Sequence, residues 1–109
     1  MPKQLNFTYK GKEYTLVFTR RTVETMERRG FVASELTEKP MSCLPDLFAG
    51  AFLANHRFVK REVIDDIFDH MTNKQELVGK LAEMYNEPIE SLFDEPEENE
   101  GNVDWTASW

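Results

Sequence analysis

The residues best suited to chemistry in this chain are three aspartates and a histidine in one short stretch: Asp65, Asp66, Asp69 and His70. If the stretch is helical, Asp66 and His70 are four residues apart and their side chains can meet on one face. A metal ion needs more converging ligands than this pair, and His56 is the only other histidine. Acidic groups on a solvated helix face are the ordinary interpretation, so we expect no metal site.

A nucleophile has little more support. Cys43 is the single cysteine, and the start of a helix can lower a thiol pKa. No histidine base can be assigned to it, and a small apolar cysteine beside Leu44 is more often simply packed. The five glycines are scattered and form no phosphate-binding loop. We therefore interpret the chain as a non-enzyme without a cofactor.

One glycine needs a separate explanation. Gly79 interrupts a helical pattern, where it costs roughly 1 kcal/mol relative to alanine. Close packing against another helix would explain it, and so would sequence drift.

The distribution of charge limits the possible partners. Residues 1–85 hold 13 basic and 12 acidic groups, whereas residues 86–109 hold 8 acidic groups and no lysine or arginine. The neutral body argues against nucleic acid, which requires concentrated positive charge. The longest apolar run, residues 47–54, is far shorter than the roughly 20 residues of a membrane span. The lone cysteine and the polar first ten residues favour the cytoplasm.

The stretch from Leu44 to Val59 predicts a central, buried helix, which the other elements must surround. Five apolar residues follow the helical spacing i, i+3, i+4, i+7, i+8: Leu44, Leu47, Phe48, Ala51 and Phe52. The opposite side is also uncharged, as expected of a helix covered on all sides. We expect Ser42 to cap this helix, Pro45 to lie in its first turn, and the helix to end near residues 55–57.

The remaining pattern predicts an α+β fold, in which an N-terminal β-hairpin packs on four to five helices. Residues 4–18 alternate as a hairpin around Lys10-Gly11-Lys12. Thr19 is the expected N-cap of a helix that runs to Arg29 and stops at Gly30. The other expected segments are a helical turn or loop over 33–39, a helix over 59–71, a helix capped by Thr72 or Asn73 and broken by Pro88, and a docked turn with Ile89, Leu92 and Phe93.

Two surfaces could bind another protein. Arg20, Arg21 and Arg28 lie on one short predicted helix; they are either a contact for an acidic partner or a solvated face. We expect one globular domain over residues 1–93 and a flexible acidic tail over 94–109.

The tail contributes four candidate protein-binding residues: Glu97, Glu98, Trp105 and Trp109. The two tryptophans could dock on another chain or on the body, or could be incidental to the composition. The hairpin adds a third possibility, because an uncovered strand edge can pair with a second copy and make a homo-oligomer.

Three stretches, together with the hairpin, resemble a known group over nearly the full length. They are FTRRTVETMERRGF (18–31), LFAGAFLANHRFV (47–59) and LAEMYNEPIESLFDEPEENEGNVDWTASW (81–109). The group comprises small proteins from tail gene clusters of phages and prophages of Gram-positive bacteria, and it is similar to the tail assembly chaperones of long-tailed phages.

The resemblance implies a small cytoplasmic protein that coats the tape-measure protein, recruits tail-tube subunits and leaves before the tail is complete. Two alternatives stay open. One is a structural tail or head–tail joining subunit that remains in the virion. The other is an acidic regulatory or inhibitory protein that mimics nucleic acid.

Overall fold

The chain begins with an antiparallel hairpin of β1 (Leu5–Tyr9) and β2 (Lys12–Leu16). The computed structural model describes residues 3–94, 101 and 103–109. Both residues of the two-residue turn have positive φ, 50° at Lys10 and 79° at Gly11, as in a type I′ turn. The register pairs Leu5 with Leu16 and Phe7 with Tyr14, so the apolar residues share one face, as predicted.

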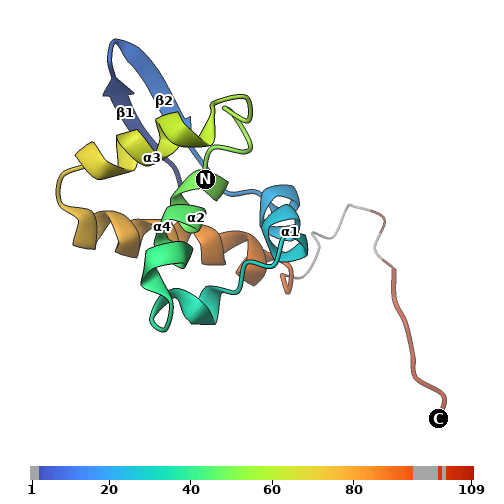
Figure 1. Ribbon diagram of the computed structural model, residues 1–109. Helices are drawn as coiled ribbons and strands as arrows, with labels where there is room; N and C mark the ends of the chain where they lie inside the picture. The colour runs from blue at the N-terminus through green and yellow to red at the C-terminus, as the bar shows by residue number, and fades with distance from the viewer. Residues whose placement is uncertain (1–2, 95–100, 102) are drawn as a thin grey trace.

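The helices follow in the predicted order. They are α1 (Arg20–Arg28), the 3-10 turn η1 (Ala33–Leu36), α2 (Pro40–Gly50), α3 (Arg61–His70) and α4 (Lys74–Ser91). Figure 1 shows α2 in the middle of the molecule, and α2 packs against α1, η1, α3 and α4. The predicted α+β class is therefore confirmed. Among the described residues, no helix has both the length and the apolarity to cross a membrane.

The apolar stripe of the central stretch forms the middle of the core. Leu47, Phe48, Ala51 and Phe52 are at most 1% exposed. Around them lie buried side chains from the hairpin and from the other helices: Tyr14, Leu16, Phe18, Val23, Met26, Ile64, Ile67, Leu77, Leu81, Met84 and Tyr85. The stretch is the scaffold of the fold.

The predicted bounds of the central helix are wrong at both ends. α2 begins at Pro40, whose fixed φ and missing N–H suit a first helical position. Ser42 therefore lies inside the helix instead of capping it. Pro45 is interior as well, and the burial of Leu47 and Phe48 outweighs the hydrogen bond that it removes.

At its other end α2 stops at Gly50, because the next residue forms a hydrogen bond with the segment that follows the hairpin. The Ala51 carbonyl accepts the Val17 N–H, at 3.3 Å. The N–H groups of Phe52 and Leu53 bond three residues back, so the chain tightens into turns. We call residues 51–59 the α2–α3 loop.

The expected break at Pro88 is also wrong. Pro88 is buried within α4, which continues to Ser91. The Arg20 guanidinium donates to the Ser91 carbonyl at 3.3 Å, which satisfies a carbonyl at the end of the helix. Of the residues in the predicted docked turn, Ile89 packs against the core as part of α4. Leu92 and Phe93 are 58% and 82% exposed, so for these two the prediction is wrong.

The helical glycines differ from expectation. A Cβ on Gly79 would meet nothing within 4 Å, so close packing does not explain this residue. The close approach occurs at Gly50, where a Cβ would overlap the Met26 thioether of α1. Gly50 is therefore the residue that lets α1 and α2 approach.

Candidate protein-binding site

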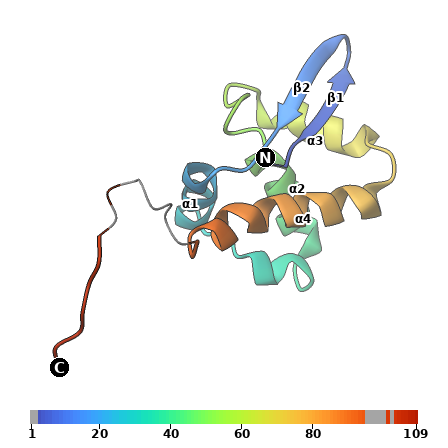
Figure 2. The same ribbon diagram turned by 180° about the vertical axis from the view of Figure 1, so that it is seen from behind.

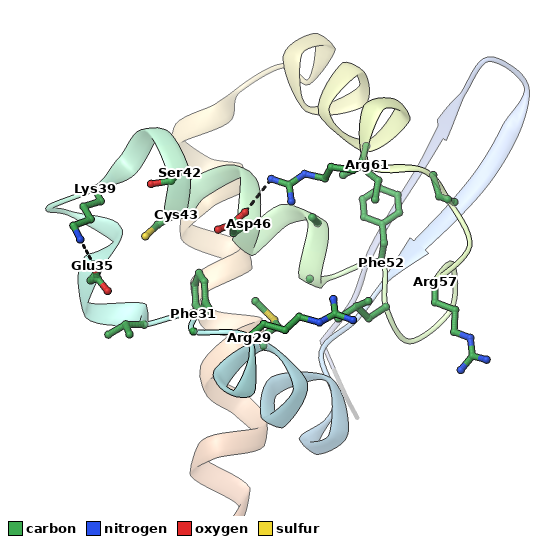
Figure 3. Close-up of a pocket in the computed structure, with 18 of the residues that line it drawn as sticks. Arg29, Phe31, Glu35, Lys39, Ser42, Cys43, Asp46, Phe52, Arg57 and Arg61 are labelled. Atoms are coloured by element: carbon green, nitrogen blue, oxygen red, sulfur yellow. Dashed lines mark hydrogen bonds and ion pairs between the residues drawn. The ribbon is translucent and has the colours of Figure 1, made fainter.

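A cavity of about 670 Å³ lies where the end of α1, η1, α2, the α2–α3 loop and the start of α3 meet (Figure 3). We call it the arginine-rimmed cavity. These segments are far apart in sequence, and α2 holds them together through its packing. Gly30, in the left-handed conformation, turns the chain after α1 and is itself in the cavity lining, and η1 then packs against α2.

The cavity lining combines apolar side chains with polar and charged ones. The α1 end contributes Met26 and Phe31, the α2–α3 loop contributes Phe52 and Leu53, and α3 contributes Ile64. Phe52 and Ile64 belong to the core, whereas Phe31 and Leu53 are only partly buried. A partner's apolar side chain could therefore cover surface that the monomer leaves accessible.

Some charged groups of the cavity form ion pairs, and others do not. Arg61 bonds Asp46 and Asp65, each at 2.9 Å, and the bond to Asp65 raises the pKa of its guanidinium. Lys39 pairs with Glu35 at 3.0 Å.

Two exposed arginines of the cavity, Arg29 and Arg57, form no such ion pair with a described residue. Among the described residues, no carboxylate lies within ion-pair distance of Arg29 or Arg57. The cavity thus presents two positive charges beside the apolar part of its lining, a combination that suits an amphipathic segment with acidic side chains.

The candidate nucleophile lies in the same cavity. Cys43 is buried in its wall, and His56 is also in the lining. The His56 Nε2 atom accepts the Thr15 N–H at 3.1 Å, and no hydrogen bond in the described structure joins His56 to Cys43. His56 therefore contributes a hydrogen bond that fixes the hairpin, and it is not placed as a base for Cys43.

The acidic helix stretch is α3. The Tyr9 hydroxyl donates to the Asp66 carboxylate, and this bond lowers the Asp66 pKa and raises the Tyr9 pKa. The His70 Nδ1 atom lies 3.8 Å from the same carboxylate. Within the described ranges, no group of three histidine, cysteine, aspartate or glutamate side chains could hold a metal ion.

The three candidate arginines of α1 have separate surroundings. Arg20 bonds the end of α4, and Arg28 pairs with Glu24 at 2.7 Å. Arg21 is exposed and does not line the cavity. Sequence reasoning missed Arg57, because only the turns of the α2–α3 loop bring it to the same cavity as Arg29.

The candidate tail residues fall partly outside the described structure. Glu97 and Glu98 lie outside the described residues. Trp105 is 80% exposed, and Trp109 is fully exposed. Two further aromatic side chains, Phe58 at 87% and Phe93 at 82%, are also exposed and were not predicted as surface residues. No periodic pattern indicated either one, because Phe58 lies in the α2–α3 loop and Phe93 follows the end of α4.

Comparison with known proteins gives one result. The family model described as "Domain of unknown function (DUF5055)" matches residues 1–109, so the chain belongs to that family. No curated protein and no solved structure matches the chain.

Proposed function

We propose that this protein is a non-catalytic assembly chaperone of the phage-tail type, which acts in the bacterial cytoplasm. In this proposal it binds the tape-measure protein and recruits tail-tube subunits. The observation that carries the proposal is the arginine-rimmed cavity, which combines apolar side chains with two arginines that have no ion-pair partner among the described residues. The resemblance of residues 18–31, 47–59 and 81–109 to tail-cluster proteins supplies the partners.

The cavity supports helix binding by its chemistry. A long tape-measure chain kept soluble before assembly must have its apolar helix faces covered. An amphipathic helix could place an apolar side chain against Phe31 and Leu53, while its acidic side chains pair with Arg29 and Arg57. Surface pairs of this kind direct specificity and association rate more than affinity.

Recruitment of a second protein is assigned to the C-terminal tryptophans. Tryptophan is common among the residues that dominate binding energy at interfaces, because one side chain buries a large apolar area. Trp105 and Trp109 are exposed and could supply such anchors. The two activities then reside in different parts of the chain and can be lost separately.

The test is co-expression with a tape-measure protein and a tail-tube protein of a long-tailed phage, followed by affinity capture. The double variant R29E/R57E should lose the tape-measure protein and keep the tail-tube subunit. The variant W105A/W109A should show the opposite pattern. R21E is the matched charge control, since Arg21 is exposed but lies outside the cavity.

Two results would reject the proposal. One is capture of the tape-measure protein by R29E/R57E at the level of R21E. The other is recovery of this protein from purified virions by mass spectrometry, which would instead support a structural tail subunit.

A further inference from the structure

The two outer edges of the hairpin differ, and the difference follows from the turn. A type I′ turn makes Tyr9 and Lys12 a hydrogen-bonded pair. Hydrogen-bonded and non-hydrogen-bonded pairs then alternate along an antiparallel ladder. The residues whose backbone groups point outward are therefore Asn6 and Thr8 in β1, and Glu13 and Thr15 in β2.

The β2 edge is occupied by the α2–α3 loop. The Thr15 N–H donates to His56 Nε2, and the Thr15 carbonyl accepts from Asn55 Nδ2, both at 3.1 Å. Figure 2 shows this loop next to β2, on the side away from β1. A strand from another molecule cannot pair here unless it displaces two side chains.

The β1 edge is open in the described structure. No hydrogen bond among the described residues reaches the backbone N–H or carbonyl of Asn6 or Thr8 from outside the hairpin. β1 also carries no charged side chain from Leu5 to Tyr9. Natural edge strands that must stay unpaired are commonly protected by charges, proline or a bulge.

A second cavity lies beside the same edge. A cavity of about 600 Å³ separates the start of β1 from α4, and Leu5, Leu77 and Met84 are in its lining. The helix-facing residues of β1 are only half-buried, whereas Tyr14 and Leu16 of β2 are buried. The core is thus incomplete on the side where the backbone is unpaired.

We propose that β1 pairs antiparallel with β1 of a second copy, forming a four-stranded sheet in a two-fold dimer. With Asn6 opposite Asn6 of the second copy, Gln4 lies opposite Thr8 and all three edge residues can bond. In this register Phe7 of one copy lies opposite Leu5 of the other on the helix-facing side, where the two half-buried side chains can contact each other. The strand is therefore complementary to itself in backbone and in side chains.

This inference goes beyond the proposed function and does not rest on it. The decisive experiment compares two proline variants of the full chain by light scattering coupled to size exclusion. T8P and E13P alter exposed residues that face each other across the hairpin, and both remove only an outward N–H. T8P should raise the dimer dissociation constant by roughly 100-fold, whereas E13P should leave it unchanged.

Circular dichroism and thermal melting establish that both variants fold. A monomeric wild-type chain, or equal dimerisation of T8P and E13P, would overturn the proposal. A monomeric chain whose T8P variant loses a captured protein would assign the edge to that other protein instead.

Cross-linking tests the register separately. Cys43 is buried, so an introduced cysteine is the only exposed thiol among the described residues. Oxidation should convert N6C to a covalent dimer, because the two Asn6 positions are opposite each other, and should leave T8C monomeric in denaturing gels. Cross-linking of T8C without N6C would overturn the proposed register.

Discussion

Two glycine-to-alanine substitutions should change stability in opposite directions. Gly79 is exposed in the interior of α4, and a Cβ there meets nothing within 4 Å. G79A should therefore gain the full difference in helix propensity, about 0.8–1 kcal/mol in the free energy of unfolding. The same change at Gly50 gains less propensity, since Gly50 is the last residue of α2.

At Gly50 the added methyl group also meets an obstacle. It would overlap the Met26 thioether, and Met26 is only 4% exposed. The flexible end of the Met26 side chain must move, and because it borders the arginine-rimmed cavity the cost lies near the lower end of the about 1–3 kcal/mol typical of overpacking. We expect G50A to lose roughly 0.5–1 kcal/mol net after the small propensity gain.

Urea denaturation of both variants measures the two changes, with equal m-values as the check that unfolding stays comparable. In thermal melts the two midpoints should move apart, by roughly 5 °C for each kcal/mol. The double variant M26A/G50A isolates the contact: in the M26A background, G50A should no longer destabilise. If G50A stabilises the wild-type chain as much as G79A, the described approach of α1 to α2 is wrong.

Three further predictions concern single polar contacts. H56A should cost about 1–2 kcal/mol, because it leaves the Thr15 N–H without its acceptor, and chemical denaturation measures this loss. T19A should cost about 1 kcal/mol by removing the N-cap of α1, and a thermal melt should show the lower midpoint. Y9F should raise the Asp66 pKa toward its ordinary value, followed by NMR titration of the carboxyl carbon. Because the folded Asp66 pKa is lowered, its small stabilising contribution is present above the unfolded pKa and disappears as pH falls through the folded one.

The sequence predicted the structure correctly where the spacing of apolar residues indicates which side chains are buried. Alternation in the hairpin predicted which side chains share a face, and the spacing of Leu47, Phe48 and Phe52 predicted the centre of the core. Both signals arise because the hydrophobic effect acts on whole faces of an element. The cap at Thr19 was equally local, since its side chain bonds the Thr22 N–H within the same turn.

Element ends were predicted less well, because tertiary contacts decide them. Pro88 is a helix breaker by local rules, yet α4 continues past it to Ser91, whose carbonyl bonds Arg20. α2 ends early because the Ala51 carbonyl is taken by the hairpin. The cavity depends on the same contacts, so the sequence could name Arg28 but could not show that Arg29 and Arg57 share a site.

The α2–α3 loop connects the two surfaces proposed to bind other molecules. Its Asn55 and His56 side chains close the β2 edge, while Phe52, Leu53 and Arg57 line the arginine-rimmed cavity. A change at His56 would therefore disturb the hairpin and the cavity together. Among the described residues, Arg57 forms no hydrogen bond or ion pair with the hairpin, and its guanidinium carbon lies 5.0 Å from the centre of the Phe58 ring. For this reason a loss of binding in an Arg57 variant can be attributed to the cavity, whereas the same loss in a His56 variant cannot.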